Sequence, residues 1–286
     1  MPSLRDRIRG PAKRTAFVLS GGGNLGAFQV GMLRALTEAG IEADVVVGCS
    51  VGALNGAAYC QDPTMRGTRV LEELWRRIEG RQVMPSGWIP QAVQLARRGG
   101  AIHDNDGLAA VISETLTVDD FEELRIEFQC VATDVLAVEE HWFAEGPLLR
   151  PILASAALPA IYPAVEIDGI TYLDGAIIND VPISRAVTLG ATEIYVLGVG
   201  NFDRPRPEPR RPIDVAIHAY WIARHHRFKR DLARVPPSVE VAILPTGGPD
   251  TPRYDDFTRS DDLIETAYRA SAEFLVARTR PTASVE

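Results

Sequence analysis

Ser50 is the residue whose surroundings most clearly predict chemistry. The β-branched residues 45–47 are typical of a buried strand, and they lead into Gly48-Cys49-Ser50-Val51-Gly52 and then into small residues typical of a packed helix. This succession indicates a nucleophile elbow, in which a strained turn exposes the serine hydroxyl at a helix N-terminus. Glycine suits the two outer positions because a Cβ there would collide with the strand or the helix. The same residues would also suit a serine that only caps the helix.

A serine hydroxyl becomes a useful nucleophile only when a base accepts its proton. Asp174 is the best candidate, because it ends a predicted strand at 170–173, and strand ends are where parallel-sheet enzymes place catalytic groups. The following Gly175 permits a sharp turn and a close backbone approach. Partial burial would raise the pKa of the carboxyl toward working pH. The alternative is an Asp-Gly turn without chemistry.

The second candidate feature is the glycine loop Gly21-Gly22-Gly23, which follows a predicted strand at 15–20 and precedes a helix. Its backbone N–H groups could stabilise the oxyanion that forms during acyl transfer. The loop also matches Gly-x-Gly-x-x-Gly, the dinucleotide fingerprint, through Gly26. A dinucleotide site needs an acidic residue after the second strand, where Ser50 stands. We therefore favour an anion cradle and keep dinucleotide binding as the alternative.

The remaining chain alternates between strand and helix patterns, which predicts an α/β fold with a mainly parallel sheet. Further strands are expected at 126–133, 140–144, 165–167, 170–173, 193–197 and 239–244. Helices are expected after the glycine loop and after Ser50, and at 67–78, 106–116, 119–124, 152–158, 182–189, 213–233 and 261–277. The Asp168-Gly169 pair predicts a tight hairpin. Residues 80–100 could form a cap over the site or an ordinary surface loop.

Length and composition predict one globular domain at 15–278, with a basic tail at 1–14 and a second tail at 279–286. The 286 residues are 46% hydrophobic and 24% charged, and the net charge of −8 argues against nucleic-acid binding. Three cysteines without metal-type spacing are typical of reduced thiols. No apolar run approaches the roughly 18 residues of a membrane span. We therefore expect a cytoplasmic protein that contacts membranes only at their surface.

Three segments together resemble the signatures of the patatin-like phospholipases, in order and in spacing. They are Gly21-Gly22-Gly23-Asn24-Leu25-Gly26, Gly48-Cys49-Ser50-Val51-Gly52 and Asp174-Gly175-Ala176, and the resemblance extends through Ala154–Pro163 to about residue 198. It implies a three-layer α/β/α sandwich that hydrolyses acyl esters of lipids without a metal or cofactor. It implies these roles: Ser50 as nucleophile, Asp174 as its base in a Ser–Asp dyad, Gly21, Gly22 and Gly23 as oxyanion loop, and Gly48, Gly52 and Gly175 as support.

One position departs from the family pattern, since Leu25 stands where an arginine or lysine is usual. Its loss leaves the dyad intact but puts a preference for charged phospholipids in doubt. It also keeps open a catalytically silent lipid-binding protein with the same fold.

Two further hypotheses concern the predicted helix at 213–233. Its histidines could complete a Ser-acid-His triad, although a helix is the wrong place for the histidine of an α/β-hydrolase. These are His218, His225 and His226. Its aromatic residues Trp221 and Phe228 stand among arginines, a mixture that can lie on a membrane surface or pack on the sheet.

Overall fold

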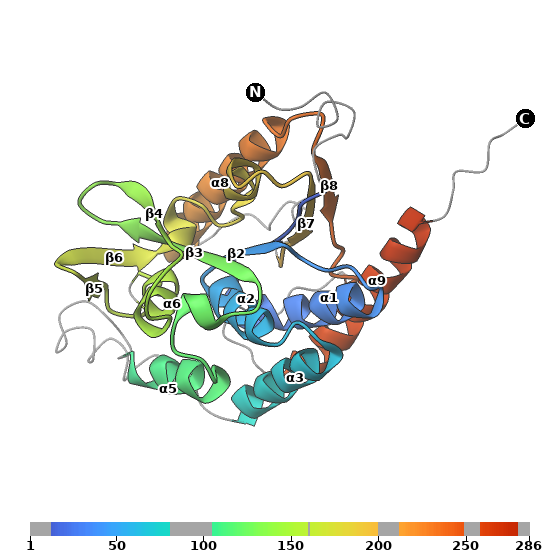
Figure 1. The fold of residues 1–286 in the computed structure, drawn as a ribbon. Helices are drawn as coiled ribbons and strands as arrows, with labels where there is room; N and C mark the ends of the chain where they lie inside the picture. The colour runs from blue at the N-terminus through green and yellow to red at the C-terminus, as the bar shows by residue number, and fades with distance from the viewer. Residues whose placement is uncertain (1–12, 81–104, 160, 200–211, 249–257, 280–286) are drawn as a thin grey trace, which may run out of the picture.

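The computed structural model describes residues 13–80, 105–159, 161–199, 212–248 and 258–279 (Figure 1). In this part of the chain, eight strands form one sheet in the order β5-β6-β3-β2-β1-β7-β8, with β4 paired to β3. The strands are β1 (Thr15–Leu19), β2 (Val45–Cys49), β3 (Glu127–Asp134), β4 (Glu139–Phe143), β5 (Val165–Ile167), β6 (Ile170–Asp174), β7 (Glu193–Leu197) and β8 (Glu240–Ile243).

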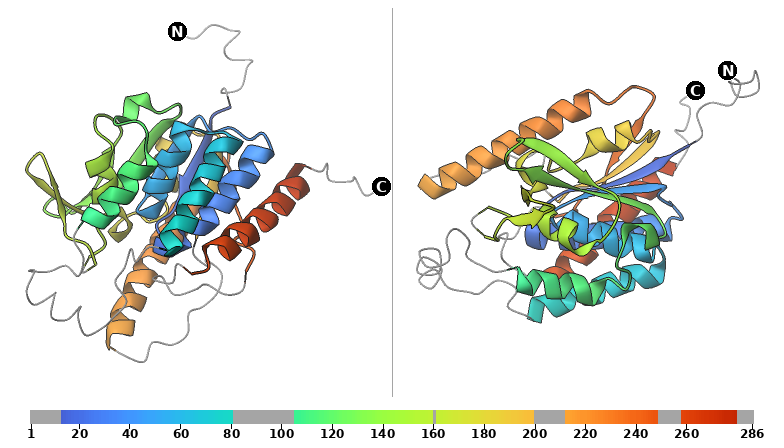
Figure 2. Two further views of the ribbon diagram at one scale, coloured as in Figure 1. Left: turned by 90° about the horizontal axis from the view of Figure 1, so that it is seen from below. Right: turned by 60° about the vertical axis from the view of Figure 1, so that its left-hand side comes forward.

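The helices cover both faces of this sheet (Figure 2). They are η1 (Gly23–Leu25), α1 (Gly26–Glu38), α2 (Val51–Gln61), α3 (Met65–Gly80), α5 (Asp106–Thr115), η2 (Phe121–Glu123), α6 (Leu149–Ser155), η3 (Gly175–Ile177), α7 (Ile183–Thr188), α8 (Pro212–Ala233) and α9 (Ser260–Thr279). This arrangement confirms the predicted three-layer α/β/α sandwich.

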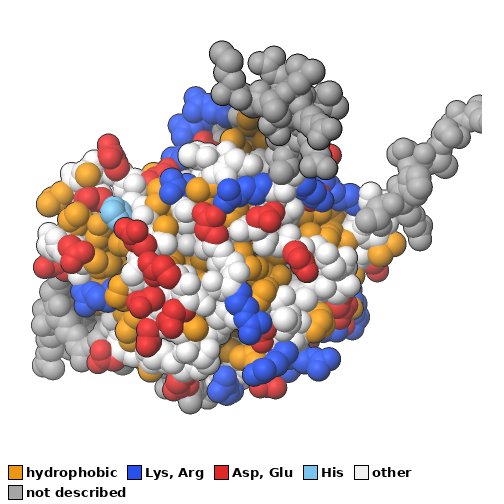
Figure 3. All heavy atoms as spheres, in the orientation of Figure 1, with side chains coloured by type: hydrophobic (Ala, Val, Ile, Leu, Met, Phe, Trp, Pro, Cys, Tyr) orange, Lys and Arg blue, Asp and Glu red, His pale blue; other side chains and the backbone are white. Residues whose placement is uncertain are grey.

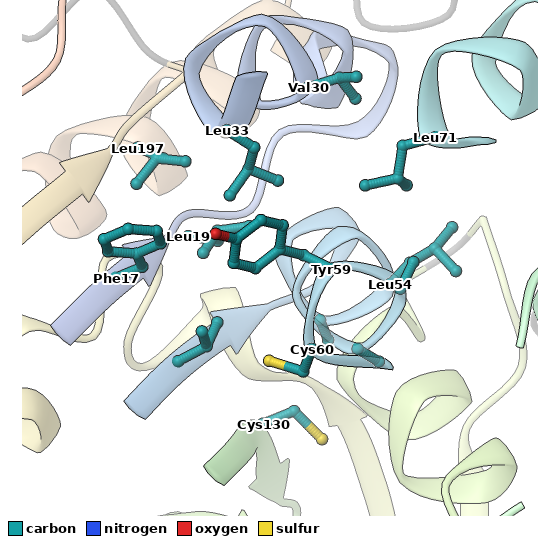
Figure 4. Packing of buried hydrophobic residues seen from close by; sticks show 14 of the residues in the cluster. Phe17, Leu19, Val30, Leu33, Leu54, Tyr59, Cys60, Leu71, Cys130 and Leu197 are labelled. Carbon is teal, nitrogen blue, oxygen red and sulfur yellow. The ribbon is translucent and has the colours of Figure 1, made fainter. Parts of the chain in front are cut away.

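Alternation along the strands produces the two cores that join the layers. Phe17 and Leu19 of β1 face the larger cluster, where Figure 4 shows them beside Leu33 of α1 and Tyr59 of α2. The intervening Val18 points to the opposite face, into a smaller cluster. That smaller cluster contains Ile183 and Ala186 of α7 and Phe228 of α8. Both faces of the central strands are therefore buried, as their continuous apolar runs predict.

The five strands β3, β2, β1, β7 and β8 run parallel. The chain crosses from β1 outward to β2 and β3, and later returns to β7 on the other side of β1. The strand order thus reverses at the carboxyl end of β1, which is where open α/β sheets place their ligand sites. The glycine loop begins at this point.

Strand β3 has an unusual pairing that brings two distant chain segments end to end. Its first part pairs in parallel with β2, as far as Val131 opposite Cys49. Its last part pairs antiparallel with β6, beginning at Ala132 opposite Asp174. Strand β4 occupies the other edge of β3 across both regions, so β2 and β6 share one edge. Their ends, and hence Ser50 and Asp174, must meet there.

The predicted elements agree with the structure except at a few boundaries. The helix predicted at 119–124 is only the single turn η2, and the helix predicted at 152–158 runs instead from Leu149 to Ser155. It starts earlier because Pro151 lies in its first turn, where a missing N–H costs nothing. Most of the segment predicted as a cap, and nearly all of both predicted tails, lie outside the described residues.

Helices α1 and α9 pack so closely that one position admits no side chain. A Cβ on Gly31 of α1 would lie 2.1 Å from the carbonyl oxygen of Ile264 in α9. Gly107 in α5 provides a contrast, because a Cβ there would meet no atom within 4 Å. Alanine substitutions at the two glycines therefore distinguish the effect of helix propensity from the effect of packing between the helices.

We predict that Gly31→Ala destabilises the protein although alanine favours helix formation. Separating the two helices should lower the free energy of unfolding by about 1–3 kcal/mol. The matched variant Gly107→Ala should be neutral, or more stable by up to about 1 kcal/mol. Urea unfolding of both variants checks this, and equal effects at the two positions would contradict the packing described.

Candidate active site

Ser50 occupies the sharp turn between β2 and α2, with φ 54° and ψ −122°. This positive φ is strained for a residue with a side chain, and the tight packing of the turn enforces it. A Cβ on Gly48 would lie 2.4 Å from the carbonyl oxygen of Gly52, and a Cβ on Gly52 would lie 2.5 Å from that of Leu19. Both flanking glycines are therefore required, as the elbow pattern predicts.

Asp174 lies directly against this serine. The Ser50 hydroxyl donates a hydrogen bond of 2.7 Å to Oδ2 of Asp174, and the backbone N–H of Ala176 donates one of 2.8 Å to Oδ1. The backbone carbonyl of Asp174 accepts a hydrogen bond from the Thr133 hydroxyl. Gly175 is needed because a Cβ there would lie 2.3 Å from the Val131 carbonyl oxygen. The carboxylate is thus fixed with one oxygen aimed at the serine.

Helix α6 and the residues after it position both members of this pair. The Ser155 hydroxyl accepts a 2.9 Å hydrogen bond from the backbone N–H of Ser50. The Ala157 carbonyl accepts a 3.0 Å bond from the backbone N–H of Asp174. Ser155 is fully buried, so water does not compete for its hydroxyl. The small residues of this segment allow the approach, which gives the segment a role that the sequence left unassigned.

Burial makes Asp174 a stronger base than an ordinary aspartate. Its side chain is 1% exposed, and desolvation raises its pKa to about 6. The hydrogen bonds from Ala176 and Ser50 and the positive charge of Arg224 oppose this rise in pKa, whereas the negative charge of Asp180 adds to it. At neutral pH the carboxylate is therefore largely ionised and able to accept a proton.

The glycine loop lies beside Ser50, but the backbone N–H groups of its three glycines differ in whether they already have a hydrogen-bond acceptor. A Cβ on Gly21 would lie 3.3 Å from Cβ of Ser50 and 2.6 Å from Oδ1 of Asp180. The Gly21 N–H already donates to the Asp180 carbonyl at 3.1 Å, so it has no proton left for an oxyanion. The Gly21 N–H therefore cannot take the oxyanion role that the family resemblance implies for it. Gly22 and Gly23 stand at the start of η1, which continues into α1, and their N–H groups donate to no acceptor among the described contacts.

A buried polar network that sequence patterns did not indicate holds the ends of this loop. The Gln29 side-chain amide donates to the carbonyl oxygens of Ser20 and Leu197. Asn55 donates to Gln29 and to the carbonyl of Gly26, and accepts from the indole of Trp75. Three helices thereby fix the loop through groups that water cannot reach. Single Gln, Asn and Trp residues within helices carry no local signal of this kind.

An ion pair from a remote helix also reaches the site. Arg224 of α8 contacts the carboxylate of Asp180, whose backbone carbonyl binds Gly21. The Asp180 carboxylate raises the pKa of Arg224 against the opposing effect of desolvation. Leu25 supplies no cation to the glycine loop, whereas Arg224 of α8 brings a positive charge to Asp180, whose carbonyl accepts from the Gly21 N–H.

The histidines predicted as alternative partners of Ser50 lie on α8. His218 and His225 pack on Trp221, with ring centroids 5.6 and 4.9 Å away. The Ser50 hydroxyl donates to Asp174 and to no histidine within the described contacts. Phe228 is 4% exposed and belongs to the core, so of the two alternatives for this residue the structure shows packing on the sheet. Its side chain points inward because position 228 lies on the face of α8 that packs on the sheet.

The fold and this site define an α/β protein with a serine elbow, an adjacent buried aspartate and a glycine loop. A model of the patatin-like phospholipase family matches residues 17–187. The chain belongs to the patatin-like phospholipase family, as its three signature segments predicted.

The chain spans only part of the length of the curated relatives that it matches. Mouse patatin-like phospholipase domain-containing protein 7 is 30% identical over 190 residues, which are 66% of this chain and 14% of the mouse protein. Lysophospholipase nte1 of Aspergillus terreus is 30% identical over 199 residues, 68% of this chain and 12% of the fungal protein. An NTE family protein of Mycobacterium bovis is 27% identical over 219 residues, 76% of this chain and 57% of the bacterial one.

The solved structure of VipD from Legionella pneumophila superposes with a TM-score of 0.48 at 12% identity, covering 94% of this chain and 67% of that one. Of the helices that the structure describes here, none is both long and apolar enough to cross a bilayer.

We predict that Asp174→Asn stabilises the protein, and more so as pH rises. Below about pH 3 the aspartate is protonated in the folded and unfolded chain alike. Between about pH 4 and 6 the unfolded chain ionises this carboxyl while the folded chain keeps it protonated, so wild type loses stability that the amide variant keeps, and the loss is complete above the folded pKa of about 6. The advantage of Asp174→Asn should grow by about 2 kcal/mol between about pH 4 and 8. Denaturant unfolding at several pH values measures it, and a pH-independent difference would contradict the burial of the charge.

Proposed function

We propose that this chain hydrolyses carboxylic ester bonds of lipids, with Ser50 as nucleophile and Asp174 as base. The observation that carries the proposal is the 2.7 Å hydrogen bond from the strained Ser50 to a buried carboxylate. Membership of the patatin-like phospholipase family supports the same chemistry. The activity needs no metal or cofactor in this mechanism.

In the acylation half of the proposed reaction, the Ser50 oxygen attacks the ester carbonyl carbon while its proton moves to Oδ2 of Asp174. The carbonyl oxygen becomes an oxyanion, and the proposed donors to it are the N–H groups of Gly22 and Gly23 at the start of η1, which bind no other acceptor among the described contacts. Collapse of this intermediate breaks the bond to the alcohol, which leaves with the proton from Asp174. The acyl group remains on Ser50.

In the second half, water replaces the alcohol. Asp174 accepts a proton from the water as its oxygen attacks the acyl carbon, and a second oxyanion forms at the same amides. Collapse returns the proton to Ser50 and releases the fatty acid. One carboxylate thus serves as base and acid in turn, which a pKa of about 6 permits near neutral pH.

We infer that single-chain lipid esters are among the substrates, since one relative is named a lysophospholipase. Such lipids dissolve poorly and gather in micelles and bilayers. The chain is therefore proposed to make transient contact with a membrane surface when it meets its substrate.

The test is release of free fatty acid from lysophosphatidylcholine, phosphatidylcholine and monoacylglycerol. Wild type should release fatty acid from at least one, and Ser50→Ala should lose that activity by a factor of about 10⁴ or more. The matched control Ser113→Ala, at an exposed serine of α5, should keep it. A folded wild type that carries bound lipid and hydrolyses none of these esters would favour a lipid-binding protein instead.

A further inference from the structure

Four exposed apolar side chains gather at one projecting end of the sheet. Leu136 and Val138, in the turn between β3 and β4, are 86% and 74% exposed, and Val135 and Ile170 are each 38% exposed. We call these four residues the apical tip. Figure 3 shows hydrophobic side chains at the left-hand margin, where β4, β5 and β6 project in Figure 1. An uninterrupted apolar run on the surface, here 135–138, is costly unless it has a function.

The apical tip is held in place by specific hydrogen bonds. The backbone N–H of Val135 donates to the Thr171 carbonyl at 3.1 Å, which ties the β3–β4 turn to the strand that begins at Ile170. The Asp134 carboxylate accepts from the backbone N–H groups of Leu136 and Ala137, each at 2.9 Å. The turn therefore presents its apolar side chains outward in a defined conformation.

Val138 combines a strained backbone conformation with an exposed side chain. Its φ is +58°, a conformation that β-branched residues almost never adopt. The described chain has two other non-glycine residues with positive φ, Ser50 in the elbow and Asp168 in the hairpin. Asparagine would fit position 138 with less strain. A strained apolar side chain directed to solvent indicates a contact that the isolated chain does not make.

The apical tip lies at the carboxyl end of β3, the same end of the strand at which Asp174 pairs with it. Ala132 of β3 is level with Asp174, and Leu136 follows four residues later. At about 3.3 Å per residue, the tip therefore extends at most about 13 Å beyond the dyad. A surface that received the tip would lie close to Ser50.

The charges around the tip decide which surface suits it. The charged residues of the two segments that form the tip, 134–139 and 166–170, are all carboxylates: Asp134, Glu139, Glu166 and Asp168. We call these four residues the acidic ring. The Arg150 guanidinium donates to the Glu166 carbonyl. An anionic surface would be repelled by this acidic ring, whereas an electrically neutral apolar phase would not. Phe228 of α8, one of the residues considered for a membrane surface, lies in the core and offers no such contact.

We propose that the apical tip inserts into neutral or zwitterionic lipid surfaces and so docks the active site against them. The proposal rests on the proposed function, since it gives a hydrolase access to lipids held in a membrane. It names the surface of the chain and the charge class of lipid that the function alone leaves open.

The experiment measures binding of the Ser50→Ala protein, which cannot consume lipid, to phosphatidylcholine vesicles. Adding Val138→Asn should weaken binding roughly tenfold, as the loss of one buried valine predicts, without harming the fold. Adding Leu136→Gln should have a similar effect. The control Val276→Gln, at a side chain of α9 that is 55% exposed, should leave binding unchanged. Mixing phosphatidylglycerol into the vesicles should weaken binding at low salt.

Several outcomes would overturn the proposal. These are equal binding by all variants, tighter binding to phosphatidylglycerol, and no binding to any vesicle. Loss of a concentration-dependent dimer in the tip variants, with vesicle binding intact, would show that a second copy of the chain covers the tip. A fluorophosphonate adduct on wild type without lipid tests the proposed hydrolase separately. An adduct without vesicle binding would refute only the docking surface, and binding without an adduct would refute only the hydrolase.

Discussion

The register of strand β3 is the constraint on which the candidate site depends. One edge of β3 accommodates β2 as far as Val131 and then β6 from Ala132 onward. The parallel strand therefore delivers Ser50 and the antiparallel strand delivers Asp174 to adjacent points on one edge. Because side chains alternate along a strand, a shift of β6 by one residue would turn the Asp174 carboxylate to the opposite face of the sheet. Gly175 allows the required closeness, since any larger residue would strike the Val131 carbonyl.

The site contains locally unfavourable features, whose cost in folding free energy the packing of the rest of the fold must offset. Ser50 is held at a positive φ, and Asp174 is buried as a carboxylate with a raised pKa. Both are unfavourable features that persist because the surroundings leave no alternative. The surroundings include the Ser155 hydroxyl on the Ser50 amide and the network of Gln29 and Asn55 at the glycine loop. Ser50 and Asp174 are thus held by groups that are themselves hydrogen-bonded within the fold.

The fold class and the two residues that the structure brings together, Ser50 and Asp174, could be predicted from the sequence because those features carry local patterns. Buried strands, the elbow around Ser50 and the Asp-Gly pair at Asp174 each occupy a few consecutive residues. The Asp180–Arg224 ion pair and the hydrogen bond between Ser155 and the Ser50 amide could not be predicted, since each joins two residues that are far apart in sequence and carry no local pattern. The hydrogen bond from the Gly21 N–H to the Asp180 carbonyl could not be predicted for the same reason. Exposure of the apolar turn at Leu136 also needs the tertiary structure.

The central claim is that Asp174 activates Ser50, and covalent labelling tests it most directly. Wild type, Ser50→Ala and Asp174→Asn would be incubated with a fluorophosphonate, and the adduct would be followed by intact mass. The account predicts one adduct on wild type, none on Ser50→Ala, and labelling of Asp174→Asn slowed about a hundredfold or more, as removal of a general base implies. An Asp174→Asn protein labelled as fast as wild type, or a folded wild type that takes no label, would contradict it.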